Sequence, residues 1–179
     1  MGGDKFKLVL LGEMQSGETI HVTFAVVDGS GNLVGDRSKD LSYQASSCQL
    51  AGTILDAEQG VTSGKAIPWD TTEQISNGGD TLIAVSDAGS FLCAIHTESD
   101  TWGYDSSTQQ SALPTGLTAA SSDAIASSGK RSMCYTGTSS GTGADLKAAI
   151  GDLNNWELNT NFVSCTSSVA RQKRPSPGG

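Results

Sequence analysis

The hydrophobic pattern of this chain is mainly one of alternation, which is typical of β-strands. Residues 18–27 carry apolar side chains at every second position from Ile20 to Val26, which predicts a strand with a buried face. The turn-forming run 28–32 and the apolar pair at 33–34 predict that this strand continues into a hairpin. Residues 5–11 are apolar at most positions, and we expect a strand buried on both faces there.

A second hairpin is expected where residues 81–86 and 90–97 flank the three-residue turn 87–89. Both arms are apolar on both faces, so this hairpin is expected to lie centrally in a sheet or in an interface. Shorter strands are expected at 132–136 and 156–165.

Two segments have the spacing of a helix instead. In residues 38–59 the apolar or small side chains step by four and three, with Asp40 as the N-cap and Gly60 as the end: Leu41, Ala45, Cys48, Gly52 and Leu55. Residues 142–145 form a capping box with Asp145 in the acidic position, and an apolar face follows from Leu146 to Trp156. A short helical turn is also expected near residues 123–125.

These elements predict an α+β, β-rich fold: an antiparallel sandwich or a partly open barrel with one or two packed helices and long loops. Residues 60–79 and 98–129 are the loops. We expect residues 1–170 to form a single compact domain, and residues 171–179 to be a basic, Pro/Gly-containing C-terminal arm.

The charge of the C-terminal arm is opposite in sign to that of the rest of the chain. The chain carries 11 Lys and Arg against 19 Asp and Glu, for a formal net charge of −8. Three cations lie in the arm, at Arg171, Lys173 and Arg174, so residues 1–170 hold 8 cations against the same 19 anions. An arm of opposite sign to its body favours contact with the acidic face of another copy or of another partner. Three cations are too few for strong phosphate binding, and no recognition of a nucleic-acid sequence is expected.

Candidate catalytic and metal-binding motifs are weak. Residues 137–141 match the G-x-S-x-G pattern of a nucleophile elbow, but no histidine follows Ser139 to act as its base. Residues 28–39 lack the glycine and glutamate of a calcium loop, and residues 60–65 are one residue short of a phosphate loop. His21 and His96 are expected to be exposed strand residues. We therefore expect no enzyme, no cofactor and no metal centre.

The four cysteines are widely spaced without a C-x-x-C pair: Cys48, Cys93, Cys134 and Cys165. Their small and apolar neighbours indicate buried thiols, with one or two disulfides as the alternative. No apolar run is long enough to cross a bilayer, so membrane insertion is not expected. The N-terminus has no signal-peptide pattern, so we expect synthesis in a host cytoplasm and a final place in an extracellular particle.

The two aromatic residues of greatest interest are Trp102 and Tyr104, which flank a glycine in a polar loop. They are candidates for a sugar-stacking or interface contact, with a buried loop anchor as the alternative. Taken together, the pattern predicts a non-enzymatic structural subunit that assembles with copies of itself and with other particle subunits. A bacteriophage virion component, such as a tail-tube or capsid/cement protein, suits this composition. The alternative is a carbohydrate-binding or adhesive β-module.

Overall fold

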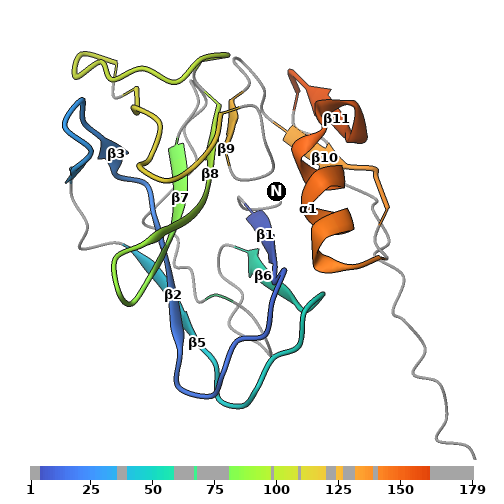
Figure 1. The fold of residues 1–179 in the computed structure, drawn as a ribbon. Coiled ribbons are helices and arrows are strands. Elements are labelled where there is room, and N and C mark those ends of the chain that lie inside the picture. The colour runs from blue at the N-terminus through green and yellow to red at the C-terminus, as the bar shows by residue number, and fades with distance from the viewer. Residues whose placement is uncertain are drawn as a thin grey trace, which may run out of the picture.

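A computed structural model describes residues 5–35, 40–58, 67, 81–97, 99–108, 110–119, 124–126, 132–138 and 141–161. The described part is β-rich with one α-helix and several sheets, none of which closes into a barrel (Figure 1). Three two-stranded sheets pair β1 (Lys5–Val9) with β6 (Ile54–Glu58), β3 (Val26–Val27) with β4 (Leu33–Val34), and β10 (Ser132–Tyr135) with β11 (Trp156–Asn159). A five-stranded sheet has the order β5 (Leu41–Gln44), β2 (Thr19–Thr23), β7 (Thr81–Ser86), β8 (Phe91–His96) and β9 (Ala124–Ala126). The predicted arm and the predicted loop 60–79, apart from Ile67, lie outside the described residues.

A long antiparallel ribbon organises the N-terminal third. β1 (Lys5–Val9) pairs with β6 (Ile54–Glu58), and β2 (Thr19–Thr23) pairs with β5 (Leu41–Gln44). Hydrogen bonds from Leu10 to Thr53 and between Met14 and Gln49 keep the same register between the two pairs. Figure 1 shows the blue and teal segments turning together at the bottom of the view. The ribbon therefore bends as one unit and brings β1 and β6 near β2 and β5.

The helix predicted for residues 38–59 is wrong, because this segment forms β5 and β6. Leu41, Tyr43 and Ala45 are buried while the residues between them are exposed, so the period is two. Gly52 has a φ of +82°, a left-handed conformation that interrupts a helix but suits the turn from Leu50 to Thr53. Pairing with residues 5–22 satisfies the backbone better than a helix with a weak apolar face.

The hairpin predicted at 81–97 is confirmed. β7 (Thr81–Ser86) is the central strand of the five-stranded sheet, and β8 (Phe91–His96) lies beside it with a bulge at Ala84 and Val85. The helical turn predicted near 123–125 is wrong, because β9 (Ala124–Ala126) runs parallel to β8 and extends the sheet. The strand predicted at 18–27 divides into β2 and β3 (Val26–Val27), and β3 pairs with β4 (Leu33–Val34) as the predicted hairpin.

Two hydrophobic clusters lie against the five-stranded sheet. The first joins side chains of β2, β5 and β7 to the ribbon residues Leu10, Met14, Leu55 and Ala57, and includes Ile67. The second has different members on β7 and β8, with Val27 of β3 and Trp102 packed against them. Because side chains alternate along β7, that strand contributes to both clusters. This arrangement explains why both arms of the hairpin are apolar on both faces.

The C-terminal elements are β10 (Ser132–Tyr135), α1 (Gly143–Gly151), a 3-10 turn at Leu153–Asn155 and β11 (Trp156–Asn159), which pairs with β10. The capping box is confirmed, since Thr142 and Asp145 exchange both of its hydrogen bonds. The helix ends earlier than the apolar face predicted, at Gly151, and Asp152 caps the 3-10 turn. Trp156 instead stacks edge-on with Tyr135 and donates its indole N–H to the Ile150 carbonyl.

The start of α1 lies against the bend of the ribbon. A Cβ added at Gly143 would stand 2.5 Å from the carbonyl oxygen of Leu11. Glycine is thus needed at the first helical position because the backbone of another element approaches so closely. This contact joins the C-terminal elements to the N-terminal ribbon.

Candidate functional site

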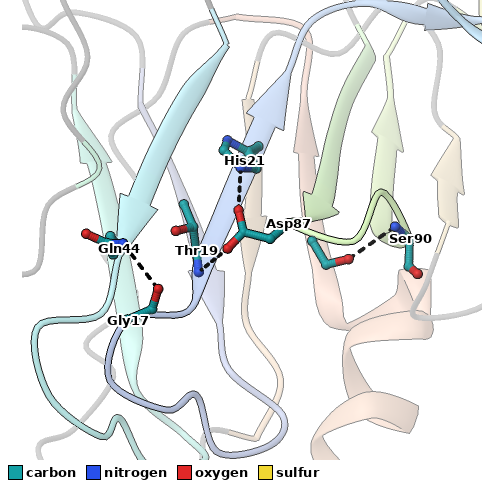
Figure 2. A network of polar contacts seen from close by, with 7 residues as sticks. Gly17, Thr19, His21, Gln44, Asp87 and Ser90 are labelled. Carbon is teal, nitrogen blue, oxygen red and sulfur yellow. Dashed lines mark hydrogen bonds and ion pairs between the residues drawn. The ribbon is translucent and has the colours of Figure 1, made fainter.

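The polar network that connects three segments at one end of the five-stranded sheet centres on Asp87 (Figure 2). Asp87 belongs to the β7–β8 turn, and its two carboxylate oxygens accept hydrogen bonds from strand β2. The Thr19 backbone N–H donates to Oδ2 at 3.1 Å, and His21 Nε2 donates to Oδ1 at 2.9 Å. These bonds lower the pKa of Asp87, with the His21 side chain as the largest cause.

This network resembles part of a hydrolytic triad but lacks its essential contacts. Ser42 is the cross-strand neighbour of His21 on β5, and Asp87 of the β7–β8 turn contacts His21 from the other side. No hydrogen bond joins the Ser42 hydroxyl to His21 in this described region, and Asp87 occupies the Nε2 atom that serves as the base in a triad. Asp87 therefore fastens the hairpin turn to β2, and the neighbouring bond from Gln44 Nε2 to the Gly17 carbonyl (3.2 Å) fastens β5 in the same way.

The two histidines have opposite environments. The His21 side chain is about one third exposed, in keeping with the expected exposed strand residue. The same expectation is wrong for His96, which is fully buried beside the second cluster. Burial lowers the pKa of His96, because an imidazolium loses its hydration there. The signal for this burial was present in the sequence, since His96 ends a strand that is apolar on both faces.

The two candidate aromatic residues have different environments in the structure. Trp102 is half-buried, packs against the second cluster and stacks on His96 with ring centroids 5.3 Å apart. It therefore fits the alternative of a loop anchor. Tyr104, two residues later, is 42 % exposed and remains available for contact.

The surface of the described residues is strongly acidic. The cationic side chains of this part are Lys5, Lys7 and Lys147. Lys7 forms a half-exposed ion pair with Asp56 at 3.4 Å. Exposed carboxylates are spread over the ribbon, the β7–β8 turn, the long loop and the C-terminal elements: Glu13, Glu18, Asp87, Asp100, Asp105, Asp145, Asp152 and Glu157. The predicted interface residues Arg171, Lys173 and Arg174 lie outside the described residues.

Large apolar side chains are also exposed. Leu50 is 61 % exposed and Leu11 is 36 % exposed, and both lie where the ribbon bends. Leu92 on β8 and Leu153 after α1 are exposed as well. Exposed leucines in isolation are ordinary, and these two lie on the paired segments of one bend.

The cysteines differ from the predicted set of four buried thiols. Cys134 is buried and disulfide-bonded, which agrees with the alternative of a disulfide. Cys48 and Cys93 are thiols, and Cys48 is exposed in the stretch 46–48 between the buried residues Ala45 and Gln49. Cys165 lies outside the described residues.

The remaining motif candidates are turns or fall outside the description. Asp28 accepts the backbone N–H groups of Ser30 and Asn32 at 2.8 and 2.9 Å, which is the hydrogen bonding of a hairpin turn and lowers its pKa. Ser139 and residues 60–65 are not among the described residues. In the described ranges no three His, Cys, Asp or Glu side chains gather as a metal site would require. None of the helices found in this part has the length and apolar character needed to cross a bilayer.

Comparison of the chain with protein-family models, with curated proteins and with solved structures gave no match. The function is therefore argued from the residues and their geometry.

Proposed function

We propose that this protein is a structural subunit that assembles with copies of itself into a larger particle, most suitably as a bacteriophage tail-tube or capsid/cement component. The observation that carries the proposal is the charge asymmetry. Exposed carboxylates are spread over the described elements, whereas Arg171, Lys173 and Arg174 gather three cations in nine residues. Opposite charges on separate parts of one chain favour contacts between copies.

The bend of the ribbon supports the same proposal. Leu11 and Leu50 lie exposed on its two strands, and Glu13 lies between them in sequence and is also exposed. Exposed leucines and an exposed carboxylate on one bend suit an interface in which apolar contacts are oriented by surrounding charge.

The architecture is proposed to be a sandwich that is antiparallel except for the β8–β9 pair. The first hydrophobic cluster joins β1 and β6 to one face of the five-stranded sheet through Leu8, Leu55 and Ala57 on one side and Val22 and Ala84 on the other. Two β layers packed face to face would give a compact body.

The test of the proposal is the assembly state of three full-length proteins, measured by analytical ultracentrifugation and electron microscopy. The variant R171Q/K173Q/R174Q removes the arm's cations and keeps its length. The variant R171K/R174K keeps the three charges and serves as the matched control. We expect the wild type and the control to assemble at low salt, and the glutamine variant to assemble less. Equal assembly by all three would overturn the role of the arm, and a monomeric wild type at all concentrations and salts would overturn assembly itself.

The alternative function, a carbohydrate-binding or adhesive module, rests on Tyr104, because Trp102 is engaged with His96 and the second cluster. If a sugar stacks on the exposed ring, Tyr104→Ala removes glycan-array binding. Wild-type protein that binds no glycan on a broad array would contradict this alternative.

A further inference from the structure

Two buried nitrogen atoms, in the rings of two side chains that contact each other, have no hydrogen-bond partner. These are Nε2 of His96 and Nε1 of Trp102, whose rings lie 5.3 Å apart at 34°. Buried polar atoms without partners are uncommon because each one loses its hydration without compensation. The occurrence of two in adjoining rings indicates that they belong to one polar arrangement.

The chemistry of the two rings makes them complementary. An indole nitrogen can only donate a hydrogen bond, whereas Nε2 of a neutral histidine accepts one when Nδ1 carries the proton. His96 Nδ1 lies 3.0 Å from the Thr81 hydroxyl oxygen, which is able to accept that proton's hydrogen bond. This tautomer leaves one hydroxyl hydrogen without a partner. The other tautomer leaves two buried N–H groups, so the Nδ1–H form is favoured.

Trp102 is also the anchor of its loop. Residues 99–108 are tied to one another and to residues 110 and 111 by the Gly103–Ser111 and Asp105–Gln110 backbone bonds and by Gln110 Nε2 to the Thr101 carbonyl. Trp102 is the member of this segment that enters the second hydrophobic cluster. Farther along, Ser111 and Ala112 are held to Val27 by hydrogen bonds of 2.9 and 2.8 Å, which leaves a fixed base when the segment moves.

We propose that one water bridges the Trp102 indole N–H to Nε2 of neutral His96 and so holds residues 99–108 on the sheet, and that protonation of His96 releases them. Protonation turns Nε2 into a donor, so the water then has to accept from both N–H groups and its own hydrogen loses the Nε2 acceptor. It also places a cation on a side chain that is fully buried. This acid-triggered release is independent of assembly through the arm.

The carboxylates of Asp28, directly after β3, and of Asp105, in the loop, accept hydrogen bonds from their own turns. Asp100 of the loop is exposed, and Asp87 follows the far end of β7. The position paired with His96 on β9 is Ala126. Lowering of the His96 pKa has burial as its cause. Asp80 and Glu98 lie outside the described residues, and the variants D80N and E98Q test whether they set the midpoint.

The experiment follows Trp102 emission and iodide quenching from pH 8 to 5 in a W69F/W156F background. We expect a red shift and stronger quenching below pH 6.5, with unchanged far-UV circular dichroism. His21→Gln, which alters the exposed histidine, serves as the matched control and is expected to keep the transition. His96→Gln is expected to abolish it. An unchanged transition in His96→Gln, no transition in the parent protein, or loss of circular dichroism at the same pH would each overturn the proposal.

A measurement on the wild-type protein covers the case in which His96→Gln does not fold. Long-range proton–nitrogen correlation spectra at pH 7.5 distinguish the two neutral histidine tautomers. We expect His96 to carry its proton on Nδ1, and its signal is assigned by its persistence in His21→Gln. A proton on Nε2 would remove the acceptor and overturn the proposal.

Discussion

Replacing Gly143 with alanine tests the contact that joins the C-terminal elements to the ribbon. The added Cβ would stand 2.5 Å from the Leu11 carbonyl oxygen, a distance that real Cβ atoms do not adopt. Because that oxygen belongs to backbone, either the ribbon or the start of α1 has to move. Overpacking of this kind costs about 1–3 kcal/mol. The gain in helix propensity from glycine to alanine is at most about 1 kcal/mol, so destabilisation prevails.

The matched control is Gly12→Ala, one residue from Leu11. A Cβ at Gly12 meets no atom within 4 Å, and its φ lies outside the left-handed range. Alanine there restricts the unfolded chain and is expected to stabilise by about 0.4–1 kcal/mol. The two substitutions are chemically identical, and the structure gives them opposite signs.

Urea unfolding followed by circular dichroism measures both variants. We expect a lower midpoint for Gly143→Ala and an equal or higher midpoint for Gly12→Ala. In thermal unfolding, 1 kcal/mol corresponds to roughly 2–4 °C for a protein of this size. If Gly143→Ala is as stable as the wild type, α1 does not begin against the Leu11 carbonyl, and the joining of the two regions is wrong.

Three further predictions concern the cap, the buried histidine and the thiols. Thr142→Ala removes the capping hydrogen bond that the Asp145 backbone N–H donates to the Thr142 hydroxyl. We expect this to lower the free energy of unfolding, measured with urea, by about 1 kcal/mol. A variant as stable as the wild type would show that this hydrogen bond does not stabilise the protein. Because burial lowers the pKa of His96 in the folded state, the unfolded state binds more protons below pH 6.5. The free energy of unfolding should therefore fall as the pH drops below 6.5, and His96→Gln should lack that slope. Finally, iodoacetamide should modify the exposed Cys48 in native, non-reduced protein but leave Cys134 unmodified, as read by peptide mass mapping; modification of Cys134 would contradict its disulfide.

Some strands could be predicted from a local pattern of apolar residues. Residues 81–97 predicted both arms of the hairpin and its turn, because apolar residues on both faces of a short run are typical of a central strand. The capping box gave the start of α1, since its hydrogen bonds are local. Elements whose signals lie within a few residues could therefore be predicted from the sequence.

Residues 41–58 show why other elements could not. Their apolar positions fit a helix by spacing, and the pairing that makes them strands joins residues from 19 positions apart (Val22 and Leu41) to 53 positions apart (Lys5 and Glu58). The contacts of Asp87 were equally hidden, because the turn that carries it was visible but the register that places it beside Thr19 and His21 was not. Short-range patterns carry no information about which strands become neighbours.

The candidate interface residues were predicted from charge alone. The acidic, lysine-poor character of the described surface agrees with the charge counted over the whole chain. The engagement of Trp102 with His96 was not predictable, since it needs the loop to return to the end of β8. The contacts of a long loop cannot be predicted from the sequence pattern, because they follow no period.

The most direct test of the central claim is the salt dependence of the assembly state. Sedimentation of the wild type and of R171Q/K173Q/R174Q is compared from low to high salt, since screening weakens contacts between exposed charges. The account predicts that the wild type forms large species that dissociate as salt rises, and that the glutamine variant is smaller from the outset. A wild type that sediments as a monomer at every salt concentration would contradict it.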